Sequence, residues 1–147
     1  MLTQETSNTP IDSSEGSIIT TGGLKLSGAD LQGIDLNRGS LMEADLSGAN
    51  LQNTDLIKAD LVGANLSGAN LQKAELIKAN LSGADLSGAD LSDADLRSAN
   101  LTGANLSNTN LKGADLSKAN LTNADLRGAF HSEADLTGAN LTSVQLV

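Results

Sequence analysis

The sequence predicts an all-β solenoid, a chain coiled around one narrow core, and two observations carry this prediction. Leucine recurs at every fifth position from Leu26 to Leu146, with His131 as the one exception. From Leu31 onward, alanine usually stands two residues before each leucine, and aspartate or asparagine stands directly before it. A helix would scatter leucines of period five around its axis, and a flat strand would alternate them between two faces. A coil that turns a corner every five residues instead points every leucine inward.

The repeating unit is A-[D/N]-L-x-x, and it departs from this pattern at few positions. The alanine is replaced by Ile34, Gly39, Thr54, Thr109 and Val144, and the aspartate or asparagine by Ser40, Glu75, Phe130 and Gln145. Over roughly residues 24–147 this array resembles the pentapeptide-repeat family, and its uninterrupted repeats look like those of cyanobacterial members. The resemblance implies a right-handed quadrilateral β-helix of about six coils, with four pentapeptides per coil. Each residue would then stack on the residue twenty positions further on.

The chain divides into three segments. Residues 1–17 are rich in Ser, Thr and Asn and poor in apolar side chains, which predicts a disordered N-terminal tail. Residues 18–25 contain Ile18, Ile19 and Leu24 and are predicted to form an N-terminal cap or a degenerate repeat. Residues 26–147 are predicted to form the β-helix.

Composition excludes several classes of function. The chain has no Cys and one His, so disulfides, thiolate metal sites and thiol catalysis are excluded, and we expect no enzyme, cofactor or metal. A net charge of −9 argues against direct binding to nucleic-acid phosphates. No apolar run of about 18 residues and no secretory signal is present, so we expect no membrane contact and a cytoplasmic location.

One predicted side of the coil, which we call the charged face, collects charges of both signs. Its acids are Asp35, Asp55, Glu75, Asp95, Asp115 and Asp135, and its bases are Arg38, Lys58, Lys78, Arg97 and Lys118. The acids would repel one another at a spacing of about 4.8 Å, and a parallel column of bases would offset this repulsion. The face is therefore either a solvated, self-neutralising surface of weak ion pairs or a strip that fixes the register of a protein partner.

Two further features are candidate contacts. The first is a predicted apolar patch on two adjoining faces, formed by Met42, Ile57, Val62 and Ile77. The second is the irregular last coil, with Phe130 in place of aspartate or asparagine and His131 in place of leucine. This coil is either a loosened end or, with Val144, Leu146 and Val147, a contact for an end-to-end homodimer, because an open coil end exposes backbone and leucine.

Three functions remain open from the sequence. The first is a non-enzymatic interaction scaffold or regulator with an unknown protein partner, since some cyanobacterial members of the family regulate cell differentiation. The second is a DNA mimic that binds DNA gyrase, as quinolone-resistance members do. A rod of about 29 Å would need roughly 17 uncompensated charges to match B-DNA, more than this chain carries. The third is a purely structural rod.

Overall fold

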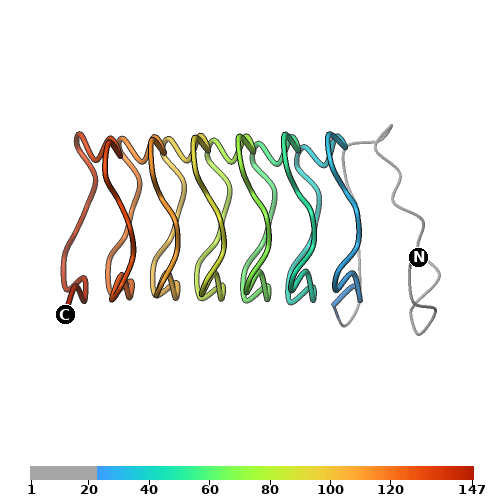
Figure 1. Ribbon diagram of the computed structural model, residues 1–147, viewed down its shortest axis with the longest axis horizontal. Helices are drawn as coiled ribbons and strands as arrows, with labels where there is room; N and C mark the ends of the chain where they lie inside the picture. Colours follow the sequence, from blue (N-terminus) through green and yellow to red (C-terminus); the bar gives the residue numbers. More distant parts are fainter. Residues whose placement is uncertain (1–22) are drawn as a thin grey trace.

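The computed structural model describes residues 23–147, which wind into a rod of stacked coils (Figure 1). Residues 1–17 of the predicted tail, and residues 18–22 of the predicted cap, lie outside the described residues. At the other end of the predicted cap, Leu24 is buried and the backbone of Lys25 forms a β-bridge with that of Asp45. Residues 23–25 therefore already follow the repeat.

Residues 23–147 contain no helix and no continuous strand, but a parallel β-bridge at every fifth residue. The 21 bridges run from the pair Lys25–Asp45 to the pair Asp125–Gln145, and each joins residues twenty positions apart. One turn of the solenoid therefore takes four pentapeptides.

Backbone hydrogen bonds explain why a five-residue unit can build this structure. Between coils, the Leu46 N–H donates to the Asn65 carbonyl at 2.7 Å, and the Asn65 N–H donates to the Ala44 carbonyl at 2.9 Å. At each corner the chain folds back on itself, as where the Ala49 N–H donates to the Leu46 carbonyl at 3.0 Å. The last three residues of one unit and the first of the next thus form a β-turn.

Each corner places the third residue of its turn, the last of the pentapeptide, in the left-handed region of backbone conformation. Glycine suits this conformation, as at Gly88 with a φ of 66°. Thirteen of the corner residues from 23 to 147 are not glycine, however, and Lys58 and Lys78 adopt φ values of 58° and 59°. The corner geometry is therefore imposed by the stacked coils on either side, whatever side chain the corner carries.

We expect Gly88→Ala to lower the free energy of unfolding by about 1–2 kcal/mol, because a Cβ disfavours the left-handed conformation. A Cβ built on Gly88 meets nothing within 4 Å, so this effect is purely conformational. Lys73→Ala is the matched control, since Lys73 already holds a Cβ at a φ of 57°. Urea denaturation of both variants would measure the difference; equal losses would contradict this account of the corners.

The core consists of leucine ladders with alanine between them. Every leucine from Leu41 to Leu121 is almost completely buried, as are the alanines between them. Thr54 and Thr109 occupy alanine positions and are also buried, because their hydroxyls donate to the carbonyls of Leu31 and Leu106 at 3.0 and 2.6 Å. The core is thus uniform along the rod, and differences between coils lie on the outer surface.

Candidate functional site

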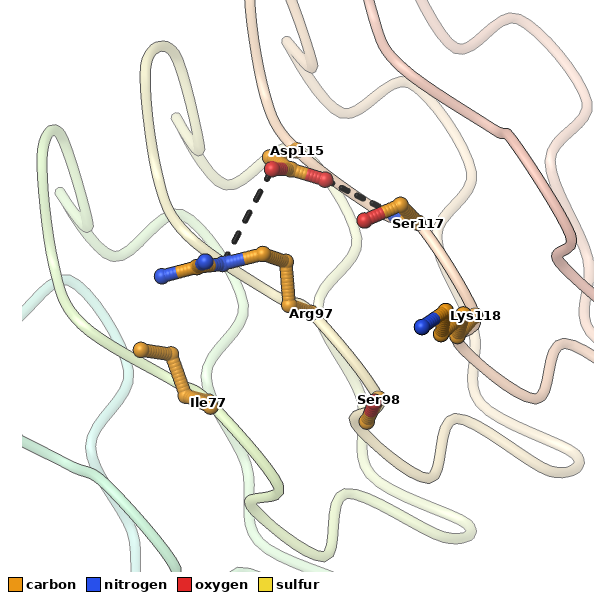
Figure 2. A pocket seen from close by; sticks show the side chains of 6 residues that line it. All are labelled: Ile77, Arg97, Ser98, Asp115, Ser117 and Lys118. Atoms are coloured by element: carbon orange, nitrogen blue, oxygen red, sulfur yellow. Dashed lines mark hydrogen bonds and ion pairs between the residues drawn. The ribbon is translucent and has the colours of Figure 1, made fainter.

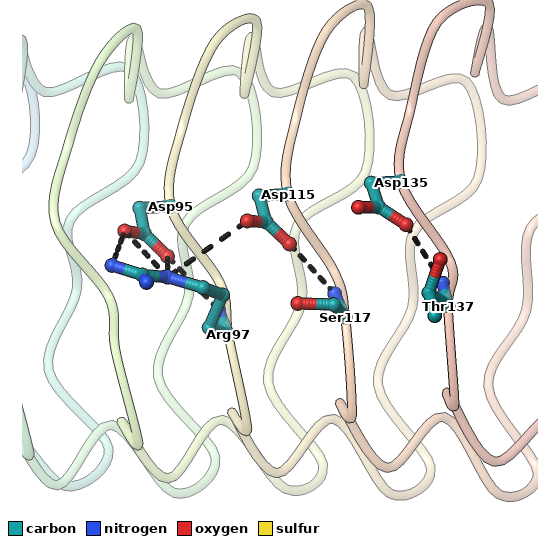
Figure 3. A network of polar contacts seen from close by, with 6 residues as sticks. All are labelled: Asp95, Arg97, Asp115, Ser117, Asp135 and Thr137. Carbon is teal, nitrogen blue, oxygen red and sulfur yellow. Dashed lines mark hydrogen bonds and ion pairs between the residues drawn. The ribbon is translucent and has the colours of Figure 1, made fainter.

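The six acids of the charged face form one continuous ladder. Bridges connect Asp35 to Asp55, Asp55 to Glu75, and so on through Asp95 and Asp115 to Asp135. Five of the six carboxylates are held in place by their own chain, since one oxygen of each accepts the N–H two residues later. The donors are Asn37, Ile57, Arg97, Ser117 and Thr137, at 2.9–3.1 Å. Figure 3 shows the last three of them.

In two of the acids, Asp95 and Asp135, hydrogen bonds stabilise the charged form of the carboxylate. The pKa of Asp135 is lowered by hydrogen bonds from the Thr137 side chain and backbone N–H. The pKa of Asp95 is lowered chiefly by its hydrogen bond with the Arg97 guanidinium. Asp95 and Asp135 are therefore held in the charged form at neutral pH.

The bases of the charged face are not neutralised in the way the sequence suggested. Arg97 pairs with Asp95, Nη2 to Oδ2 at 2.6 Å, and its Nε lies 3.8 Å from Asp115 Oδ2 (Figure 3). The other four bases form no ion pair within residues 23–147. These four bases occupy corners in the left-handed conformation; they are Arg38, Lys58, Lys78 and Lys118. Arg97 lies one position earlier in its repeat, directly after Leu96.

The charged face therefore has one edge of acids and one edge of bases. Figure 2 shows this for one coil, in which Asp115 and Lys118 lie on either side of Ser117. Between the two edges runs a third column, which contains Ile57, Ile77 and Arg97. Charges of opposite sign are thus separated across one face.

A shallow recess of about 530 Å³ opens on the charged face (Figure 2). Its lining residues are Ile77, Arg97, Ser98, Asp115, Ser117 and Lys118. We did not predict this recess, although the sequence contains one signal for it: Ser98 occupies a corner where the two preceding coils carry lysine.

The predicted apolar patch is divided in two. Met42 stacks on Val62, and Ile57 stacks on Ile77, but the corner residue Lys58 and then Asp60 lie between the two pairs along the coil. Met42 is 43% exposed, whereas the other three side chains are half-buried. Two short apolar ridges, one of them in the charged face, replace the single patch.

The last coil keeps the regular bridges of the coils before it, including those of Phe130 with Asn110 and of Gln145 with Asp125. A recess of about 190 Å³ opens at its end; the lining residues are Leu126, His131, Leu136, Leu141, Val144 and Leu146. Phe130 is 57% exposed and is not among them. The structure therefore brings His131, Val144 and Leu146 together but places Phe130 apart from them.

Outside the charged face, Asp125 forms the second arginine pair. The Arg127 side chain donates to both carboxylate oxygens, from Nε at 2.9 Å and from Nη2 at 2.6 Å, and the Arg127 N–H adds a bond at 3.0 Å. The side-chain hydrogen bonds, followed by the backbone bond, lower the pKa of Asp125 to about 2.

We expect Asp125→Asn to weaken the pH dependence of stability. The pKa of Asp125 is lower in the folded chain than the ordinary value of 3.8. As the pH falls, the Asp125 carboxylate is therefore protonated in the unfolded chain before it is protonated in the folded chain. Stability is therefore lost between about pH 4 and pH 2. Asparagine keeps the backbone bond, as Asn120 does with the Thr122 N–H. Tm should fall less steeply with pH in the variant than in the wild type, and parallel curves would contradict this.

The part of the chain that the structure describes contains no cluster of three or more His, Asp or Glu side chains able to hold a metal ion. His131 is exposed in the terminal coil and lines the apolar recess there. No helix in residues 23–147 is long and apolar enough to span a membrane.

Comparison with known proteins identifies the repeat. The family model of pentapeptide repeats matches in eight copies, over residues 25–61, 49–88, 89–128 and 119–147. No protein with a curated description matches the chain.

Several solved structures are similar. A pentapeptide repeat protein from the thylakoid lumen of Arabidopsis thaliana is 30% identical, with 80% of this chain and 75% of that chain covered and a TM-score of 0.55. HetL, a pentapeptide repeat protein involved in heterocyst differentiation regulation in the cyanobacterium Nostoc sp. strain PCC 7120, is 37% identical over 82% and 69%, with a TM-score of 0.39. Another pentapeptide repeat protein from Nostoc is 43% identical over 77% and 84%, with a TM-score of 0.30.

Proposed function

Because the chain belongs to the pentapeptide-repeat family, whose members form right-handed β-helical solenoids and are generally structural or interaction proteins, we propose that it is a non-enzymatic interaction scaffold. The charged face is its binding surface, and the partner is a protein. A quadrilateral cross-section of about six coils is part of this proposal. The twenty-residue spacing of the bridges supports it.

The separation of charge across the charged face supports this proposal best. Among the described residues only Arg97 forms ion pairs on this face, so the other four bases are free to pair with a partner. Unpaired charges in a fixed, repeating order offer a partner one favourable alignment and penalise others. The Ile57–Ile77 ridge adds apolar contact area between the two edges.

The same charge pattern disfavours mimicry of DNA. A mimic needs acids without nearby bases, whereas the longest acid ladder here has a base at the corner of four of its six coils. A purely structural rod does not account for the separation of charges. An end-to-end homodimer is a second proposal, supported by the apolar recess at the last described coil.

We expect the double change Lys58→Ser and Lys78→Ser to weaken capture of a specific partner from native lysate by roughly tenfold or more. The side chains of the two lysines form no hydrogen bond or ion pair with residues 23–147, and serine keeps their backbone hydrogen bonds to Ile77 and Arg97, so folding should be unaffected. Lys73→Ser is the matched control, because Lys73 occupies the same kind of corner on another face. Capture that survives the double change but is lost with Lys73→Ser would place the binding surface elsewhere.

A further inference from the structure

We propose that the charged face binds the charged face of a second copy of this chain, with the two rods side by side and pointing in the same direction. This inference rests on the proposed function, because it names the partner of the same face. Three observations lead to it: the charge balance of the face, the positions of its two edges, and the matching of charges within each coil.

The charged face has a small net charge although it carries many charged residues. The chain carries a net charge of −9. The charged face, with six acids and five bases, carries only −1, so the rest of the chain carries the remaining −8. Two copies that meet through this face therefore bring together nearly equal numbers of opposite charges, so their net repulsion is weak.

The positions of the two edges decide the direction of the rods. In a parallel pair, a two-fold axis along the rods exchanges left and right, so the acid edge of each copy lies opposite the base edge of the other. In an antiparallel pair, the two-fold axis crosses the rods, and acids lie opposite acids. Like charges placed directly opposite are destabilising, so the face is self-complementary only in the parallel arrangement.

The parallel arrangement also matches the charges coil by coil. A two-fold axis along the rods leaves height unchanged, so each coil meets its own counterpart. The matched pairs would be Asp35 with Arg38, Asp55 with Lys58, Glu75 with Lys78, and Asp115 with Lys118. The coil between Glu75 and Asp115 has Ser98 at its corner, and it is in this coil that the acid, Asp95, pairs within its own chain through Arg97.

The column between the edges lies on the two-fold axis. Ile57 would contact its counterpart, and Ile77 would do the same, which removes both half-buried side chains from water. The two Arg97 side chains would also face each other. Each is already paired with its own Asp95, and the recess of about 530 Å³ beside them leaves room for both.

The first test is self-association of the full chain, measured by sedimentation equilibrium at low and high salt. We expect dimers at about 50 mM salt that dissociate at about 500 mM, where charges are strongly screened. The variant Lys58→Glu/Lys78→Glu should be monomeric, and so should Asp55→Lys/Glu75→Lys, but their mixture should form dimers as the wild type does. Glutamate is tolerated at such corners, as Glu43 and Glu133 show.

Two control variants make this test specific. Lys73→Glu changes the same charge at a corner of another face and should leave the dimer intact. Leu146→Asn alters the open C-terminal coil and should also leave it intact. A dimer lost with Leu146→Asn and retained in both charge variants would overturn the proposal in favour of end-to-end association.

Cysteine cross-linking tests the direction of the rods, even if a charge variant fails to fold. The chain has no native cysteine, so single substitutions report single contacts. Ser117→Cys and Asn37→Cys should each form disulfide-linked dimers with themselves, because both positions lie on the two-fold axis. A disulfide between Asn37→Cys of one copy and Thr137→Cys of another would show antiparallel rods and refute the proposal.

The outcomes separate this inference from the proposed function. A chain that is monomeric at low salt, but captures another protein in a manner that depends on Lys58 and Lys78, refutes the second copy and retains the scaffold. A chain that neither self-associates nor captures a partner through this face refutes both.

Discussion

Replacing Leu81 by alanine is expected to lower the free energy of unfolding by about 2.7–5 kcal/mol. Leu81 has no exposed surface and packs within a ladder that has leucine on both sides, so the cavity cannot be filled by a neighbour without strain. Urea denaturation monitored by circular dichroism would measure the loss.

Leu141→Ala is the matched control for this change. Leu141 belongs to the same ladder, but it lies in the last described coil and is 47% exposed. Less surface is transferred from water there, and the loss should be about 1 kcal/mol. Equal losses at the two positions would mean that the rod does not gain its stability from leucines enclosed between coils.

Deleting one pentapeptide, residues 89–93, is expected to weaken binding through the charged face while leaving the chain folded. Every later leucine still points inward, because all sides of the coil share the same core pattern. The outward residues after the deletion, however, would all shift to the neighbouring face of the coil. Asn100 would follow Glu75 in the acid ladder, and Asp95 would move to another face. Binding should fall by roughly tenfold or more.

Deleting a complete coil, residues 79–98, provides the control. Asp115 would then follow Glu75 in the acid ladder, and both edges of the charged face would be preserved. This larger deletion should lower stability more, since it removes a full layer of contacts, but it should retain binding. If the five-residue deletion bound as well as the twenty-residue deletion, the order of charges on the face would be irrelevant to the partner.

The sequence predicted the interior of this molecule well. Leucine and alanine at fixed positions within a period of five settle which side chains face inward, and the family resemblance, confirmed by the comparisons, added the twenty-residue stacking. The acid ladder from Asp35 to Asp135 follows directly from that spacing. Burial of a core side chain depends on its size and its position in the repeat, so a regular repeat is enough to predict it.

The outer surface was harder to predict, because it depends on the direction in which each side chain leaves the backbone. We predicted one column for Lys58 and Arg97, but Arg97 directly follows its leucine whereas Lys58 lies at the left-handed corner, and only Arg97 reaches the acids. Phe130 and Leu146 are also apart for this reason. Phe130 takes the outward position directly before a leucine position, whereas Leu146 lines the recess at the end of the last coil. The regular bridges of the last coil also show that His131 is accommodated in place of leucine without any shift of register.

The serial stacking of coils has a mechanical consequence. Each coil is hydrogen-bonded only to the coil before it and the coil after it, and the last described coil has a neighbour on one side alone. Tension applied at that end would therefore unfold the chain one coil at a time, starting from the last described coil. Each layer that detaches would release twenty residues, or about 65–70 Å of extended chain, so the force would rise and fall at even intervals.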